Sequence, residues 1–194
     1  MTSDDNELLN KILSSFDQIS YTKSEEIPDI ELYMDQVTTF METHLGKTKR
    51  KSEDKILTKT MINNYAKNHL LPPPNKKKYS KEHIMLLIFI YYFKNILSIS
   101  DIQTLLGPLN ETYFSSEKEI NLKTIYEQIF SLEPKMIEAL KKDVTEKFRT
   151  SSETFSNAAD TEQDYLQLLS FIAMLGFDVY IKKQLIERLV DTLS

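Results

Sequence analysis

The chain has 194 residues, of which 41% are hydrophobic and 27% are charged, and its formal net charge at pH 7 is −5. This composition is sufficient for one compact body with a substantial core and argues against wholesale disorder. The absence of cysteine excludes disulfides, thiolate metal sites and a cysteine nucleophile, and the few glycines and prolines favour helices over a many-stranded sheet.

Apolar residues at helical spacing predict three helices in the first part of the chain. The first covers about residues 4–18. The second has Asp29 as its N-cap and continues to Leu45. The third is capped by Thr58, ends near Asn68 and is followed by three consecutive prolines, which cannot continue a helix.

Two more helices are predicted in the middle of the chain. The first is capped by Ser80, ends near Leu97 and contains the apolar run IMLLIFIYYF. This run has ten residues, whereas a membrane-spanning helix needs roughly 20, so we interpret it as a buried core helix. The next helix begins with a capping box of Ser100 and Gln103 and is closed by Gly107-Pro108.

The last third of the chain also predicts helices. Asn121 opens one helix, and Pro134 lies in the first turn of another. Residues 149–159 form a predicted linker, and the final helical part is predicted to break at Gly176.

An apolar stripe on this final part predicts a homodimer, because it can pair two copies across a two-fold axis. The alternative is that the stripe closes the core of the monomer. Its members are Ile181, Leu185, Leu189 and Val190.

Positive charge is concentrated between Lys47 and Lys81. This segment contains eleven basic residues and two acidic ones, Glu53 and Asp54, so its local charge is +9. The rest of the chain therefore carries −14. A basic patch on an acidic body can hold a polyanion on one face while the remaining surface repels it. The alternative interpretation is a solvated lysine surface without a ligand.

The segment LTKTMINNYAKNHLLPPPNKKKYSKEHIMLLIFIYYFKNILSISDIQTLL, residues 57–106, resembles the DNA-binding domain of mercury-resistance (MerR) type regulators. The resemblance rests on a helix ending in a tyrosine and a leucine pair, on a basic wing with a Tyr-Ser pair, and on the helices that follow. The chain departs from that pattern at Asn63, where the family has arginine, and at His69, where it has glycine. Its wing is also shorter.

A wider resemblance covers about residues 28–106. The strings PDIELYMDQVTTFM, LTKTMINNYAKNHLLPPPNKKKYSKEHI and LLIFIYYFKNILSISDIQ are similar to the bacterial family called domain of unknown function 1836. This resemblance implies a helix-turn-helix-like fold and no particular activity. We therefore expect an all-α helical bundle with an N-terminal helix and loop (1–27), a winged helix-turn-helix (MerR-like) core (28–110) and a C-terminal helical module for dimerisation or effector sensing (111–194).

The predicted function is that of a DNA-binding transcription regulator on double-stranded DNA. Lysines of the wing would contact phosphates, whereas asparagines of the preceding helix can pair with adenine. The alternative function is an all-helical adaptor that uses its basic face on an acidic protein. The candidate DNA-binding residues are Lys59, Thr60, Asn63, Asn64 and Tyr65 on the helix and Lys76, Lys77, Lys78 and Tyr79 on the wing.

These residues also have simpler interpretations: Asn63 and Asn64 as exposed polar positions, and Tyr79 as a ring packed under the loop. The three prolines would stiffen the wing because their φ angles are fixed. No effector is indicated.

Signals for catalysis, metals and membranes are weak or missing. No phosphate-binding glycine loop or nucleophile elbow occurs, and no histidine has the i, i+4 partner of a helical zinc site. The acidic cluster at residues 160–164 is explained by the positive end of a helix dipole. We expect no enzyme activity, no cofactor, no metal, no membrane contact and, without a signal peptide pattern, a cytoplasmic location.

Overall fold

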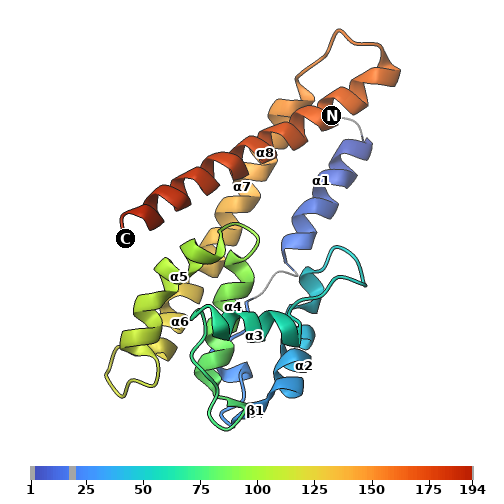
Figure 1. The fold of residues 1–194 in the computed structure, drawn as a ribbon. Helices are drawn as coiled ribbons and strands as arrows, with labels where there is room; N and C mark the ends of the chain where they lie inside the picture. Colours follow the sequence, from blue (N-terminus) through green and yellow to red (C-terminus); the bar gives the residue numbers. More distant parts are fainter. Residues whose placement is uncertain (1–2, 18–20, 194) are drawn as a thin grey trace. The chain divides into compact units, whose positions relative to one another are not determined.

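The computed structural model describes residues 3–17 and 21–193 and is mostly helical (Figure 1). The chain divides into two compact units, a smaller one of residues 1–20 and 132–186 and a larger one of residues 21–131 and 187–194. These boundaries differ from the three predicted segments, because residues 111–131 belong to the same unit as the predicted core 28–110.

The larger unit contains most of the secondary structure and a single antiparallel strand pair. Its elements in chain order are η1 (Ser24–Glu26), β1 (Leu32–Tyr33), α2 (Met34–Leu45), η2 (Gly46–Thr48), α3 (Lys59–Lys67), β2 (Lys78–Tyr79), α4 (Lys81–Phe93), α5 (Ile99–Pro108), the π-helical turn η3 (Leu109–Tyr113) and α6 (Leu122–Phe130).

Helix α4 forms the centre of this unit. All residues from Ile84 to Ile90 are at most 5% exposed, so the helix is buried on every side. It begins after Ser80, whose backbone N–H donates to Nδ1 of His83 at 3.0 Å. The prediction of a buried core helix starting at Ser80 is confirmed, but the helix ends at Phe93 and not near Leu97.

Aromatic rings fill the space between α4 and α6. The ring centroids of Phe89 and Phe130 are 5.4 Å apart, and those of Tyr126 and Phe130 are 4.3 Å apart. The hydroxyl of Tyr126 is buried and donates to the carbonyl of Thr22 at 2.5 Å. This bond fastens the segment before η1 to α6, and burial raises the pKa of the Tyr126 phenol well above its ordinary value.

Two predicted helix starts in the larger unit are wrong. The second predicted helix begins at Met34, not at Asp29, because Leu32 and Tyr33 pair with β2 as a strand. Asp29 instead forms an ion pair with Lys81, with an Nζ–Oδ1 distance of 2.6 Å.

Helix α5 begins two residues earlier than its predicted capping box at Ser100 and Gln103. Ser98 Oγ accepts the N–H of Asp101 at 3.1 Å, and the Asp101 side chain accepts the N–H of Ser98 at 3.1 Å. Its predicted end at Gly107-Pro108 is also wrong: Pro108 has helical angles, and the chain continues directly into η3. The predicted caps Thr58 and Asn121 are confirmed.

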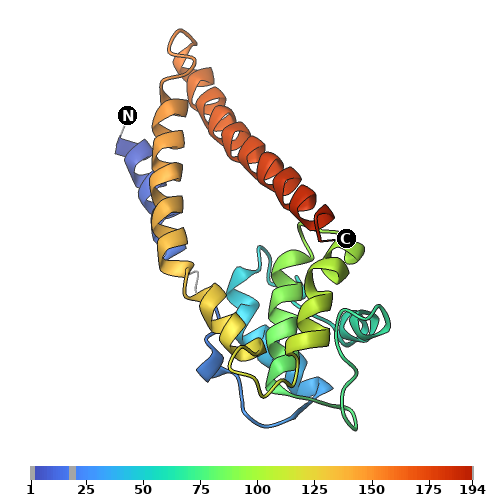
Figure 2. The ribbon, with the colours of Figure 1, turned by 90° about the vertical axis from the view of Figure 1, so that its left-hand side faces the viewer.

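The smaller unit consists of α1 (Ser3–Phe16), α7 (Glu133–Ser152) and most of α8 (Asp160–Asp191) (Figure 2). Its buried core is small and comprises Leu9, Val144, Phe148 and Phe171. The rings of Phe148 and Phe171 meet edge to face at 5.2 Å. The first predicted helix is confirmed, although its predicted last residue, 18, lies outside the described residues.

Helices α7 and α8 are longer than the sequence predicted. Pro134 lies in the first turn of α7, as predicted, but the helix continues through residues 149–152 of the expected linker. Helix α8 passes Gly176 without a break, because this glycine has an ordinary helical φ and nothing crowds its α-carbon. Of the acidic cluster at residues 160–164, the side chain of Asp160 is outside the described part, whereas Glu162 and Asp164 are exposed.

Helix α8 exposes many apolar side chains. Of the predicted dimer stripe, Ile181, Leu185 and Leu189 are more than half exposed, whereas Val190 is buried. Among the described residues, this one helix is long and apolar enough, by length and composition, to cross a membrane, which is weak evidence for such a role. The prediction of no membrane contact rested on the shorter run in α4 and did not include this segment.

Candidate nucleic-acid interface

The predicted basic wing is a tight β-hairpin. Its turn is closed by the Lys78 N–H, which donates to the carbonyl of Asn75 at 2.9 Å, and these two residues form a β-bridge. Beyond the turn, Lys78 and Tyr79 continue as β2, which pairs antiparallel with β1. The prolines were predicted to stiffen the wing, but they precede the turn, and strand pairing holds the tip.

Two lysines occupy the left-handed region of backbone space in this turn. Lys76 has φ 47° and Lys77 has φ 66°, the signs that a two-residue type I′ hairpin turn requires. Glycine or asparagine usually fills such positions, since an L-residue with a β-carbon costs roughly 1–2 kcal/mol there. No Asn-Gly or Asp-Gly pair marks this turn, so sequence reasoning missed it.

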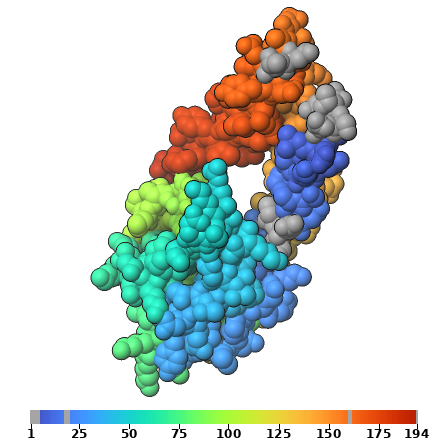
Figure 3. Space-filling view, turned by 90° about the vertical axis from the view of Figure 1, so that its right-hand side faces the viewer, coloured from blue at the N-terminus to red at the C-terminus, as the bar shows by residue number. Residues whose placement is uncertain are grey.

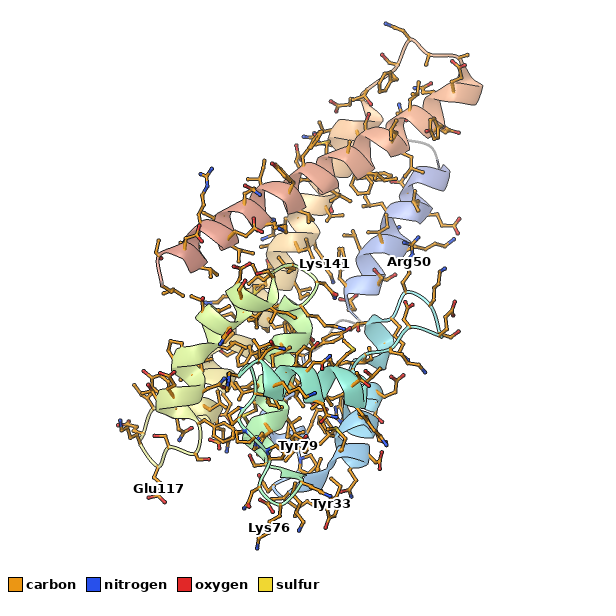
Figure 4. The ribbon with its side chains drawn as sticks, in the orientation of Figure 1. Tyr33, Arg50, Lys76, Tyr79, Glu117 and Lys141 are labelled. Carbon is orange, nitrogen blue, oxygen red and sulfur yellow. The ribbon has the colours of Figure 1, made fainter. Side chains whose placement is uncertain are left out.

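The tip is open to solvent. The side chains of Lys76 and Lys77 are exposed, and the tip stands out from the surface of the larger unit (Figures 3 and 4). Lys78 is half-buried, with its Nζ 5.4 Å from the ring centroid of Tyr33. Two exposed apolar side chains, Ile30 and Tyr33, lie in or just before the paired strand β1.

Helix α3 presents a polar face. Thr60, Asn63 and Asn64 are exposed, as their predicted role requires, whereas Ile62 is fully buried. Lys59 is also exposed, but it is ion-paired with Asp35 of α2, so its charge is partly neutralised.

The end of α3 has a hydrogen-bond pattern that stops the helix. His69 has φ 55°, its N–H donates to the Ala66 carbonyl at 3.2 Å, and the Leu70 N–H donates to the Tyr65 carbonyl at 2.9 Å. This is a Schellman motif, whose left-handed position is usually glycine. The Asn110 amide donates to the Leu70 carbonyl at 3.1 Å and so joins the motif to η3.

Two predicted site residues are in the core. Tyr65 is 7% exposed and Tyr79 is 3% exposed, and burial raises the pKa of both phenols. The Tyr79 ring packs edge to face on His83 at 5.5 Å. Expecting these tyrosines to contact DNA was therefore wrong, because alternation along β2 points Tyr79 inward and helical spacing buries Tyr65.

His83 links α4 to the segment before the hairpin. It is 5% exposed, its Nδ1 accepts the Ser80 N–H, and its ring also packs edge to face on Phe114 at 4.8 Å. Burial lowers the pKa of His83 below its ordinary value, against a smaller opposing effect of the Pro73 and Pro72 carbonyls. The imidazole is therefore neutral and packs in the core beneath the hairpin.

The basic window from Lys47 to Lys81 does not form one patch. Arg50 lies in the loop after η2, at the opposite end of the larger unit from Lys76 (Figure 4). In that loop, Lys49 is ion-paired with Glu42. The prediction of a single positive face is therefore wrong. Lys78 lies on the strand that pairs with β1, and Lys76 and Lys77 lie in the turn before it.

Among residues 3–17 and 21–193, no cluster of three or more histidine, aspartate or glutamate side chains could hold a metal ion. A shallow groove of about 690 Å³ runs between the end of α3 and α5 and is lined by Ala66, His69, Pro72, Pro73, Gln103 and Thr104, among others. Its lining also includes the carboxylate of Glu111, and one carboxylate among mostly neutral side chains does not define a ligand class.

Comparison with known families identifies the larger unit. The profile described as Domain of unknown function (DUF1836) matches residues 22–129, more than half of the chain. The chain belongs to this family. The DUF1836 region contains α3, the hairpin and α4, so it includes every residue of the candidate interface. No curated protein and no solved structure matches the chain. The resemblance to DUF1836 is thus confirmed, whereas that to MerR-type regulators stays a prediction.

Proposed function

We propose that the protein is a DNA-binding transcription regulator that contacts DNA with the hairpin lysines and the exposed face of α3. The observation that carries the proposal is the hairpin tip, where Lys76 and Lys77 hold left-handed conformations that glycine would adopt at lower cost. Strained backbone at an exposed, charged tip supports a role for those side chains outside the folded chain. On double-stranded DNA, the anion available for contact with a cluster of lysines is the backbone phosphate.

The order of elements supports the same function. Strand β1, helices α2 and α3, and a hairpin that returns to pair with β1 follow one another along the chain. This is the order expected of a winged helix-turn-helix, in which the second helix reads the groove and the wing contacts the backbone. The long connection between Gly46 and Thr58 is an insertion in that arrangement.

The decisive variant replaces Lys76 by Asn and Lys77 by Gly. This pair removes two charges but is the preferred sequence for the observed turn, so the fold should be equally or more stable. We expect weaker binding to all DNA fragments and a salt dependence of log K reduced by about 0.9 per lost phosphate contact. Fluorescence anisotropy against DNA from the surrounding genomic region, at several salt concentrations, measures both quantities, and thermal unfolding measures stability.

The matched control is Lys135→Ala with Lys142→Ala on α7, which removes two exposed charges elsewhere. Lys142 is ion-paired with Glu138 within α7, whereas Lys141 is a poorer control because its ion pair with Asp17 connects α7 to α1. The control variant should bind DNA like the wild type. If the hairpin variant binds with unchanged affinity and salt slope, the hairpin does not contact DNA.

Sequence reading should depend on α3. Replacement of Asn63 or Asn64 by Ala should cost about 1–3 kcal/mol on a preferred site selected from genomic fragments, and much less on random DNA, if that side chain contacts a base edge. An equal loss on both kinds of DNA would assign the residue to backbone contact.

One observation favours a second function, that of an adaptor for an acidic protein. Ile30 and Tyr33 are 68% and 55% exposed close to the hairpin lysines, and an apolar surface next to positive charge fits a protein partner better than a phosphate backbone. In this case Tyr33→Ala should abolish partner binding, and DNA should not compete for the protein.

A further inference from the structure

Helix α8 has a regular seven-residue apolar repeat. Counting Tyr165 as position a, the a positions continue with large or β-branched apolar residues and the d positions are mostly leucine. The a positions are Tyr165, Ile172, Val179 and Ile186, and the d positions are Leu168, Leu175, Lys182 and Leu189. A repeat sustained over three to four heptads is typical of a coiled coil.

The repeat faces solvent within the smaller unit. Tyr165, Ile172 and Val179 are 66%, 56% and 67% exposed. The side of α8 that packs in its own unit centres on Phe171, at position g, which is 3% exposed and joins the core with Phe148. Of the d positions, Leu175 also packs against this core and is partly buried. The a positions therefore have no internal role that explains their apolar character.

We propose that α8 pairs with α8 of a second copy as a parallel coiled coil, with Ile172 and Val179 in the centre of the seam. This inference does not depend on the proposed DNA binding. Branched apolar residues at a with leucine at d favour two parallel strands. Tyr165 at the first a position gives each copy a large amphipathic side chain at one end of the seam.

Charge placement selects the parallel orientation. Asp178 is at position g and Lys183 at position e of the next heptad, the two positions that meet between helices of a parallel pair. In an antiparallel pair, g positions face g positions and e positions face e positions, so Asp178 and Lys183 would not meet. Lys182, the one polar residue among the d positions, forms an ion pair with Asp178 of its own chain at 2.8 Å, so its charge is compensated.

Single cysteines test the seam directly, because the chain has none of its own. Ile172→Cys should form a covalent dimer under mild oxidation, since equivalent a positions of a parallel pair are close enough for a disulfide. The matched control is Phe177→Cys at position f, which is also more than half exposed, at 68%, but lies on the side of the helix away from the seam. We expect dimer from Ile172→Cys and little or none from Phe177→Cys at the same protein concentration.

Sedimentation of the unmodified protein gives an independent measurement. We expect a dimer in equilibrium with the 22.7 kDa monomer, and Val179→Asp should raise the dissociation constant roughly tenfold or more by placing an unpaired carboxylate in the seam. Phe177→Asp, which makes the same change outside the seam, should leave the dissociation constant unchanged, and circular dichroism would verify that both variants fold. A monomer at all concentrations, equal crosslinking of the two cysteines, or association that Val179→Asp does not weaken would overturn the proposal. Uptake of monomers by lipid vesicles would also overturn it and assign the face to a membrane.

Discussion

Helices α4 and α8 each contain a long apolar stretch, but these stretches differ in burial. In α4, every residue from Ile84 to Ile90 is at most 5% exposed. In α8, Ile172, Val179 and Tyr180 are all more than half exposed. An apolar helix whose residues face all directions is enclosed by its own domain, whereas one with an apolar seven-residue repeat can bury that face only against another helix.

The largest expected effect tests this difference in burial. Ile88→Ala in α4 should lower the free energy of unfolding by about 2–5 kcal/mol, since it removes a fully buried side chain and leaves a cavity. Ile172→Ala in α8 should change the stability of the monomer by no more than about 0.5 kcal/mol. Urea unfolding at low protein concentration measures both. Equal losses would mean that Ile172 is already buried within the monomer.

A second prediction uses the pH dependence of the larger unit. Because burial lowers the pKa of His83 in the folded state, folding favours the neutral imidazole. Burial of the neutral imidazole therefore stabilises the fold fully above the unfolded pKa of about 6.5, and this stability is lost as the pH falls through the lower folded pKa.

Thermal unfolding between pH 8 and pH 5 should therefore show a loss of stability on the acid side that His83→Gln reduces. Glutamine can still accept the Ser80 N–H but does not titrate. We expect a smaller effect than that of Ile88→Ala, and one confined to the larger unit. A pH profile that is the same in wild type and variant would show that His83 is not the group responsible.

The two regions also differ in how well the sequence predicted them. The starts capped by Thr58 and Asn121 were located correctly, because these side chains accept a free N–H in the first turn whatever the tertiary structure. The strand β1 was missed because two residues carry no periodicity, and the turn at Lys76 because lysine is a poor signal for a left-handed backbone. The prediction of one basic patch was wrong for another reason. Arg50 and Lys76 are close in the sequence, but the fold separates them.

For helix α8, the sequence predicted a break that the structure does not contain. Gly176 suggested a break, since glycine lowers helix stability by about 1 kcal/mol relative to alanine, but one such cost is small compared with the backbone hydrogen bonds of a 32-residue helix. The sequence also contained the heptad repeat, yet the predicted dimer stripe shared only Leu189 with it and included Val190, which is buried. The burial of Phe171 and the packing of Leu175 on the same core show which side of α8 is already occupied within the smaller unit.

A third prediction concerns the end of α3 in the larger unit. His69→Gly should stabilise the protein by about 1 kcal/mol, because glycine adopts the left-handed conformation of the Schellman motif without a steric cost. The neighbouring change Asn68→Gly, at φ −90°, should bring no gain. Thermal unfolding of the two variants would test the assignment, and a destabilised His69→Gly protein would indicate that the imidazole makes contacts that outweigh the backbone strain.

The smallest expected effect is the counterpart in the smaller unit. Gly176→Ala should stabilise α8 by about 0.5–1 kcal/mol, because alanine restricts the unfolded chain and is the better helix former. Nothing lies within 4 Å of the β-carbon that this change would add, so steric cost should not offset the gain. Hydrogen exchange of α8 amides, measured at low protein concentration to avoid association, would show slower exchange around residue 176. If protection does not rise, α8 is not a continuous helix at Gly176 in solution, and the seam through Ile172 and Val179 would lose its regular spacing at this point.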